Sequence, residues 1–259
     1  MGGQPVTDLS RTLTVFAGGE PVTGFIHARL TGMEAVGLDP MPFTLRLWNL
    51  AEEDDPVLAA AKVLSVRHGD SVLAAGRVSD ACRRTVPEGT VTEVVFSAGL
   101  PLWEAPVSLS VEAGVSVSET VRRILAASGT GIGLLSFPGT DPVRKRGQAF
   151  CGRAAECVEE ALSAAGARGY LTEAGLCAVP AEGLPVSMAL SADDLLDKPV
   201  AVGKGLLLLR TEVTGWPLGK QASVKWAGGS AEGLVTERSV DADTAEGNWQ
   251  SELLLELTV

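Results

Sequence analysis

Two histidines are the side chains in this sequence that are best suited to acid–base catalysis or metal binding. His27 lies in a run of strand-like residues, and His68 precedes Gly69 and Asp70 in a turn. Neither histidine has a carboxylate or a thiol at the spacing that would place two metal ligands on one face of a helix. We therefore expect both histidines to lie on the surface or to line a pore.

Two glycine-containing segments resemble motifs that bind phosphate or carry a serine nucleophile. The segment GTGIG, at 129–133, follows a helix-like segment instead of preceding one, and no Lys-Ser or Lys-Thr pair comes after it. The segment GGSAEG around Ser230 lacks the G-x-S-x-G spacing of a nucleophile elbow. We interpret the first segment as the end of a helix and the second as a connection between strands.

Charged residues cluster at three places along the chain. Glu52 to Asp55 and the pair Asp193 and Asp194 lack the alternating oxygen ligands of a calcium loop, so we expect solvated charge at both. The first of these runs precedes PVLAAA, and it could equally begin a short helix or lie in a loop. The basic run RKRG, at 144–147, is too short for a nucleic-acid site, and we expect it in a loop or against an acidic partner.

The cysteines indicate neither a zinc site nor a disulfide framework. Their spacing fits neither pattern, and buried free thiols are the simpler interpretation of Cys82, Cys151, Cys157 and Cys177. The sequence therefore predicts no catalytic residue, no metal ligand, no cofactor and no enzyme activity.

The composition and the net charge exclude some kinds of binding partner. The chain has 259 residues, of which 46% are hydrophobic, and its net charge of -11 would repel nucleic acid and anionic membranes. The first residues, MGGQPVTD, do not form a secretory signal. The longest uncharged run, Ile124 to Thr140, contains glycines and a proline, which excludes a membrane helix there. We expect a protein kept in the cytosol or carried out as part of something larger.

The pattern of elements predicts an α+β protein that is mainly β. Short alternating runs from Thr12 to Ala113 indicate successive strands. Ser116 and Glu119 form a capping box before a helix over 117–128, which ends at Gly129. A second apolar stripe from Ala154 to Ala165 predicts another helix, and YLTEAGLCAVP predicts a hairpin whose turn contains Gly175.

Strand signals return from Val200 to the last residues, after the polar segment SADDLLDKP, which predicts a linker or a short helical turn. The expected organisation is thus two β-barrels around a small α+β domain. The boundaries that we predict are 1–114 for the first barrel, 115–190 for the α+β domain and 191–259 for the second barrel.

Three segments together resemble the central hub proteins of phage baseplates and tail tips. FTLRLWNL, at 43–50, is similar to a strand ending in Asn-Leu near the start of those proteins. The segment at 60–80 is similar to their strand, glycine turn and Gly-x-Val step, with Gly76 and Val78 in place. DADTAEGNWQSELLLEL, at 241–257, is similar to their closing Asp, gap, Gly-x-Trp pattern, although Val240 replaces a histidine or aromatic residue.

The resemblance implies a structural hub in a virion tail, at its baseplate or tip, assembled in the host cytoplasm. It implies a homotrimer in which each chain gives two similar tube-like barrels, so that six barrels meet a hexameric tail tube around a central channel. The implied partners are the tail tube protein, the spike or tip protein, baseplate wedge or adaptor proteins and the tape measure protein. DNA would pass through without specific binding, and no membrane is involved. The chain is shorter than the larger hubs, which leaves no room for a fused spike or lysozyme.

Two expectations concern the last strand and the inner wall. We expect Trp249 to anchor the last strand, and Leu253 to Leu257 to pair inward or across a subunit seam. An acidic wall would let DNA pass by like-charge repulsion. The alternatives are a receptor-binding or carbohydrate-binding β module, a neighbouring tail adaptor, or a peptidoglycan hydrolase whose residues are scattered along the chain.

Overall fold

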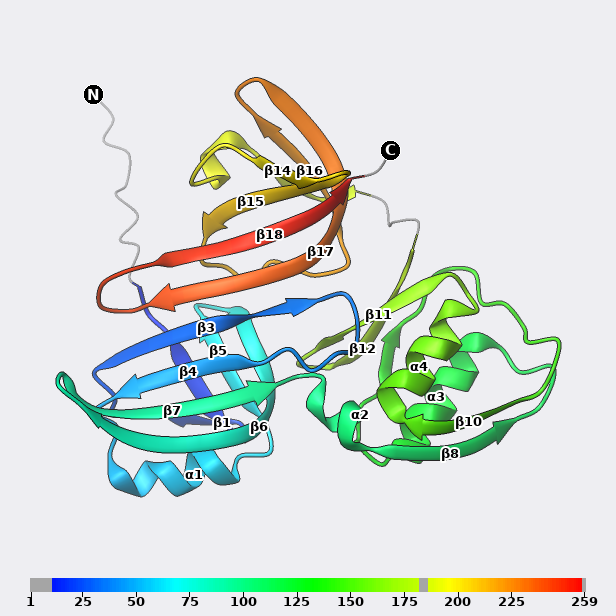
Figure 1. The fold of residues 1–259 in the computed structure, drawn as a ribbon, viewed down its shortest axis with the longest axis horizontal. Coiled ribbons are helices and arrows are strands. Elements are labelled where there is room, and N and C mark those ends of the chain that lie inside the picture. Colours follow the sequence, from blue (N-terminus) through cyan, green and yellow to red (C-terminus); the bar gives the residue numbers. More distant parts are fainter. Residues whose placement is uncertain (1–10, 182–185, 258–259) are drawn as a thin grey trace.

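The computed structural model describes residues 11–181 and 186–257, and its fold is mainly β with an α+β unit at one side (Figure 1). The largest sheet runs in the order β14-β15-β18-β17-β3-β4-β7-β6-β5-β1-β2, with β16 pairing β17 and β13 pairing β16. Three separate clusters of buried apolar side chains lie within it and beside it.

The first β unit is an antiparallel array built from the N-terminal strands. The hydrogen-bonded order of its main strands is β3-β4-β7-β6-β5-β1. A short 3-10 helix, Glu52–Asp54, and helix α1, Asp55–Ala60, connect β4 to β5, so the acidic run does begin a helix. The strands of the unit are β1 (Thr14–Ala17), β2 (Glu20–Val22), β3 (His27–Ala35), β4 (Phe43–Trp48), β5 (Leu64–His68), β6 (Ser71–Val86) and β7 (Gly89–Ser97).

The α+β unit packs two helices against short sheets. The strand VSLSV, expected in the first barrel, is β8, and it pairs antiparallel with β10 instead. It does so because Val107 and Val111 pack against the helices of this unit. The elements are α2 (Leu100–Glu104), β8 (Pro106–Val111), α3 (Val117–Ser128), β9 (Leu134–Ser136), β10 (Gln148–Arg153), α4 (Ala154–Ser163), β11 (Ala167–Thr172) and β12 (Gly175–Pro180).

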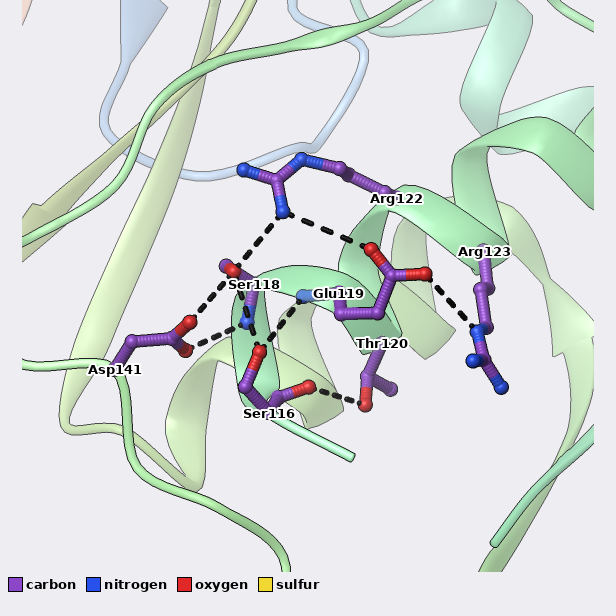
Figure 2. Close-up of polar contacts among 7 residues, drawn as sticks. All are labelled: Ser116, Ser118, Glu119, Thr120, Arg122, Arg123 and Asp141. Atoms are coloured by element: carbon purple, nitrogen blue, oxygen red, sulfur yellow. Dashed lines mark hydrogen bonds and ion pairs between the residues drawn. The ribbon is translucent and has the colours of Figure 1, made fainter. Parts of the chain in front are cut away.

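Helix α3 has the predicted bounds, but half of its predicted cap is different. The Ser116 hydroxyl accepts a hydrogen bond from the backbone N–H of Glu119, as expected, and Gly129 is left-handed at the other end. The Glu119 carboxylate instead pairs with Arg122 and Arg123. Asp141 accepts from the backbone and hydroxyl of Ser118, at 2.9 and 2.7 Å (Figure 2). A loop carboxylate therefore already occupies the positive end of this helix.

The second β unit comprises the C-terminal strands. Its order is β13-β16-β17-β18-β15-β14, and a 3-10 helix at Ala192–Asp194 is the short helical turn that was one of the two alternatives for this segment. Its strands are β13 (Val186–Leu190), β14 (Val200–Gly203), β15 (Leu206–Glu212), β16 (Gln221–Trp226), β17 (Gly229–Asp243) and β18 (Trp249–Leu257).

The two β units share one strand order. Replacing β1, β3, β4, β5, β6 and β7 by β13, β14, β15, β16, β17 and β18 turns the first order into the second. The neighbouring pairs match in direction, except that β1 runs antiparallel to β5 whereas β13 runs parallel to β16. This likeness is a repeat within one chain.

The repeat is visible in the sequence once the strands are aligned. Residues 65–80 read SVRHGDSVLAAGRVSD, and residues 223–237 read SVKWAGGSAEGLVTE, one residue shorter in the hairpin turn. Register shifts occur at Ser79 and Thr236, and these hydroxyls donate to equivalent carbonyls, those of Val95 and Leu254. The alternation of strand residues does not indicate this repeat, although the shared G-x-V-[S/T]-[D/E] step was a usable signal.

Strand β17 belongs to both units. Before Thr236 it pairs with β16, and from Glu237 to Asp243 the same edge pairs with β3. Val235 accordingly packs in the core of the second unit, whereas Val240 and Ala242 pack in the core of the first. The units are therefore joined by a continuous ladder while keeping separate cores.

Strand β18 lies in the middle of the second unit, between β15 and β17. Leu253 and Leu255 are fully buried, whereas Trp249, which we expected to anchor the sheet of the second barrel, packs on the core of the first unit. Of the two alternatives expected for Leu253 to Leu257, the structure shows the inward one, because both edges of the strand are already paired within the chain. Removing residues 246–259 should unfold the second unit, so a loss of trimers would not identify a seam.

Candidate functional site: an open sheet face with two free edges

Among the described residues, none of the three apolar cores lies on one face of an eight-stranded part of the sheet. The strands are β14-β15-β18-β17-β3-β4-β7-β6, and Figure 1 looks onto them, with β1 and β5 behind. Side chains alternate along each strand, so one set enters the two cores and the other faces outward. We call the outward set the open face. Its residues are Val200, Val202, Leu206, Leu208, Arg210, Glu212, Gln250, Glu252, Leu254, Glu256, Glu237, Ser239, Asp241, Arg29, Thr31, Met33, Thr44, Arg46, Trp48, Val91, Glu93, Val95, Asp80, Cys82 and Arg84.

Arginine–carboxylate pairs cross the strands of the open face. Arg210 donates to Glu252 at 2.8 Å, and Arg46 donates to Glu93 at 2.8 Å. Arg29 binds both carboxylate oxygens of Asp241, at 3.1 and 3.2 Å. Such exposed pairs each contribute only about 0–1 kcal/mol, so their main effect is to set the charge of the face. Carboxylates outnumber guanidinium groups on the open face. The arginines of this face are Arg29, Arg46, Arg84 and Arg210, and its acidic residues are Asp80, Glu93, Glu212, Glu237, Asp241, Glu252 and Glu256.

A buried ion pair lies where the two units meet. Arg238 of β17 is 4% exposed, and its guanidinium lies 2.6 Å from the carboxylate of Glu34 on β3. It also donates to the carbonyls of Leu73 and Trp216, which belong to different units. Burial raises the pKa of Glu34, and Arg238 only partly offsets this; burial likewise lowers the pKa of Arg238. The ion pair therefore helps to hold the joint between the two units, where β17 pairs with β3, although burying the two charges costs free energy.

The other end of the joint contains His27, which the sequence placed on a surface or in a pore. Its Nε2 lies 2.6 Å from Asp243, and its ring stacks on Trp48 with centroids 4.0 Å apart. Asp243 also accepts from the backbone N–H of Ala245, which holds the turn between β17 and β18. His27 thus ties the first unit to the β17–β18 turn, and its side chain is only 21% exposed. The His27 side chain is therefore half-buried, and it lies on the same face of β3 as Arg29.

The residues that carried the family resemblance have structural roles. Asn49 is left-handed, with a φ of 58°, and its side-chain oxygen accepts from the N–H of Thr90. A Cβ on Gly76 would lie 2.2 Å from the carbonyl carbon of Ser97, so only glycine fits there. Gly247 has a φ of 109° in the turn before Trp249. The motifs therefore specify strand contacts and turns.

The remaining sequence candidates are dispersed. His68 donates to the carbonyl of Thr12 at 2.9 Å and meets Trp249 edge-on. GTGIG ends α3, and GGSAEG lies in the β16–β17 hairpin, as interpreted from the sequence. Asp194 accepts hydrogen bonds from Ser191, which lower its pKa, and Arg144 of the basic run lies over the Phe150 ring.

The four cysteines differ in burial. All four thiols are free, as predicted, but Cys157 alone is buried and Cys151 is exposed. Within 11–181 and 186–257, no group of three or more His, Cys, Asp or Glu side chains could hold a metal ion. No helix in these two ranges is long and apolar enough to cross a membrane.

Two edges of the eight-stranded sheet are free. Among the described residues, β14 pairs only with β15, and the half of β6 from Asp80 to Val86 pairs only with β7. Val200 and Val202 on β14 are 52% and 50% exposed. An exposed apolar edge strand is a template for pairing with another chain.

No protein-family model matches the sequence, and no curated protein matches it. The fold, however, is that of phage tail proteins. A tail protein from Neisseria meningitidis MC58 has a TM-score of 0.70 at 10% identity, covering 94% of this chain and 95% of that one. The 43 kDa tail protein of prophage MuSo2 from Shewanella oneidensis has a TM-score of 0.69 at 11% identity, over 94% and 95% of the two chains.

A third similar structure comes from a secretion system. The E. coli c3393 protein is a component of the type VI secretion system and is structurally similar to the bacteriophage T4 tail proteins gp27 and gp5. Its TM-score is 0.67 at 11% identity, with 93% of this chain and 75% of that chain covered. These likenesses agree in fold with the resemblance drawn from the sequence.

Proposed function

We propose that this chain is a structural subunit of a phage or phage-like tail hub, and that it acts as a homotrimer without enzyme activity. Each chain would present two equivalent β units, so three chains would present six to a hexameric tail tube. The units of this proposal follow the order predicted from the sequence, which is a β unit, an α+β unit and a second β unit. The proposed neighbours are the tail tube, spike or tip, wedge or adaptor and tape measure proteins.

The repeated strand order is the observation that supports this function most. A threefold particle can match a sixfold ring when each chain carries two like docking units, and a single chain has no other evident need for two copies of one topology. The likeness to tail proteins in fold supports the same conclusion.

The open face is the proposed wall of the central channel. Its excess of carboxylates would repel DNA phosphates, so DNA would pass without adhering. The arginines that cross its strands are paired with carboxylates, which removes them as phosphate ligands. The hub would lie in the virion tail, at the baseplate or tip, after assembly in the host cytoplasm.

The mass of the purified protein in solution tests this function. Light scattering at micromolar concentration should give three times the chain mass of 26.8 kDa. A single-chain mass across that concentration range would contradict the proposal. Electron microscopy of the same sample should show six lobes around a hole, and a solid particle would also contradict it.

A further inference from the structure

The basic run at 144–147 has no part in the proposed function. It lies between β9 and β10, and residues 142–147 are called the basic loop from here on. The loop ends where Gln148, the first residue of β10, pairs with Val111, the last residue of β8. Strand β8 runs away from both β units, so the basic loop lies at the far end of the α+β unit (Figure 1). A protein bound there would not touch the two β units.

Three backbone hydrogen bonds hold the basic loop in place. The N–H of Gly114 donates to the carbonyl of Arg144 at 2.9 Å, and the N–H of Arg144 donates to the carbonyl of Val115 at 3.0 Å. The N–H of Val117 donates to the carbonyl of Pro142 at 3.0 Å. The loop is thus ordered before any partner binds, which lowers the entropic cost of binding.

The basic loop presents positive charges that the chain does not neutralise. Lys145 and Arg146 are exposed, and neither forms an ion pair with any residue that the structure describes. Three carboxylates around the loop are already bound to other side chains. These pairs are Glu112 with Arg123, Asp141 with Ser118 and Glu160 with Gln148.

Arg144 adds a hydrogen-bonding group that the chain leaves unused. Its guanidinium lies over the ring of Phe150, with Cζ 5.4 Å from the ring centroid. The Nη1 atom of Arg144 is buried, and it has no hydrogen-bond partner within 11–181 and 186–257. A buried donor without a partner costs free energy, and an anion bound against the guanidinium would offset part of that cost.

Apolar side chains adjoin these cations. Val143 is 59% exposed, and with Val117, Pro142 and Ala164 it lines a pocket of about 480 Å³ beside the basic side chains. This combination fits a peptide in which an apolar residue stands next to carboxylates. Nucleic acid fits less well, because three cations are few for a phosphate backbone and the net charge of the chain is -11.

We propose that the basic loop is a docking site for an acidic segment of another protein. Carboxylates of that segment would face Arg144, Lys145 and Arg146, and an apolar residue between them would enter the pocket beside Val143. The rest of this acidic chain would repel such a segment, so the charges would direct it to the basic loop. A second copy of this chain is not the occupant, because the loop lies away from the β units that would join the copies. Only the identity of the partner as a tail protein rests on the proposed function.

A labelled acidic peptide tests this docking site on the full-length protein. The probe is a fluorescent peptide, Asp-Glu-Leu-Glu-Asp, and its anisotropy should rise to saturation on titration with wild type at low ionic strength. Lys145→Glu combined with Arg146→Glu should weaken binding about tenfold, because two attractions become repulsions. Val143→Ser should weaken it about threefold by removing apolar contact.

Lys198→Glu combined with Lys204→Glu is the matched control, because both lysines are exposed and the net charge changes by the same amount. This variant should bind the peptide as wild type does. Equal weakening by the two double variants, or no saturable binding to wild type, would overturn the docking site. Tighter binding of a duplex DNA probe at the same loop would also overturn it.

The peptide titration and the mass measurement separate this inference from the proposed function. A trimer without loop-dependent peptide binding would remove the docking site and leave the hub standing. A single-chain mass with loop-dependent binding would remove the hub and leave the docking site standing.

Discussion

Gly76 and Gly233 occupy equivalent places in the two β units, and each lets two strands approach more closely than a side chain would allow. A Cβ on Gly76 would lie 2.2 Å from Ser97, and a Cβ on Gly233 would lie 2.6 Å from Glu256. Ser97 and Glu256 are themselves equivalent in the repeat. The same steric constraint has thus been kept twice, and it explains the glycine of the Gly-x-Val step in physical terms.

Replacing either glycine by alanine should destabilise the protein. The added methyl group collides with backbone atoms that cannot move without breaking strand pairs, so each of Gly76→Ala and Gly233→Ala should cost about 1–3 kcal/mol of unfolding free energy. Gly139→Ala is the control, because nothing lies within 4 Å of the new Cβ. Urea unfolding measures all three variants. Equal stability of Gly76→Ala and Gly139→Ala would contradict the close contact.

Asp55 links helix α1 to the sheet of the first unit. Its carboxylate accepts from the guanidinium of Arg83 and, at 2.9 Å, from the hydroxyl of Thr92. Burial would raise the pKa of Asp55, but the Arg83 and Thr92 hydrogen bonds and the Arg83 charge outweigh it, so the pKa is lowered. A lowered folded pKa stabilises the protein above the ordinary value of 3.8. That stability is lost as the pH falls through the folded value.

Asp55→Asn should therefore destabilise the protein in a pH-dependent way. At neutral pH the loss should be about 1–3 kcal/mol, the usual contribution of a hydrogen bond to a charged group. The difference from wild type should shrink as the pH falls through the pKa of Asp55, as measured by urea unfolding across that range. Asp54→Asn, which removes a neighbouring carboxylate, should change little. A difference that stays constant with pH would contradict the role given to the Asp55 charge.

At the scale of elements, the sequence predicted the features whose residues lie close together along the chain. Helix α3 was predicted to the residue because Ser116 and Gly129 mark its ends. The pairing of β8 was missed because alternation predicts a strand but not its neighbour. His27 with Asp243 and Arg238 with Glu34 join residues far apart in the sequence, so no spacing pattern indicates them. The two-unit repeat could have been found, since residues 65–80 and 223–237 match closely.

At the scale of the whole molecule, residues that share a core come from separate parts of the sequence. The core of the first β unit includes Val213, Val240 and Ala242, and Trp249 packs against it. The core of the α+β unit includes Leu102, Val107 and Val111, which precede the boundary at 114. The proposed boundaries at 114 and 190 thus cut through two cores. The chain therefore folds as interlocked units, which would keep the two docking surfaces of the proposed hub in a fixed relative position.

Fragments of the chain test this interlocking. Fragment 1–114 lacks β17 and should not unfold cooperatively, because its core is open where Val240 and Ala242 belong. Fragment 115–190 lacks β8 and should fail for the same reason, whereas fragment 100–181 keeps every buried member of the α+β core except Leu38 and should fold. Near-ultraviolet circular dichroism and thermal unfolding distinguish these outcomes. If 115–190 unfolded as cooperatively as 100–181, then β8 would not be part of that core, and the boundary would lie where the sequence first placed it.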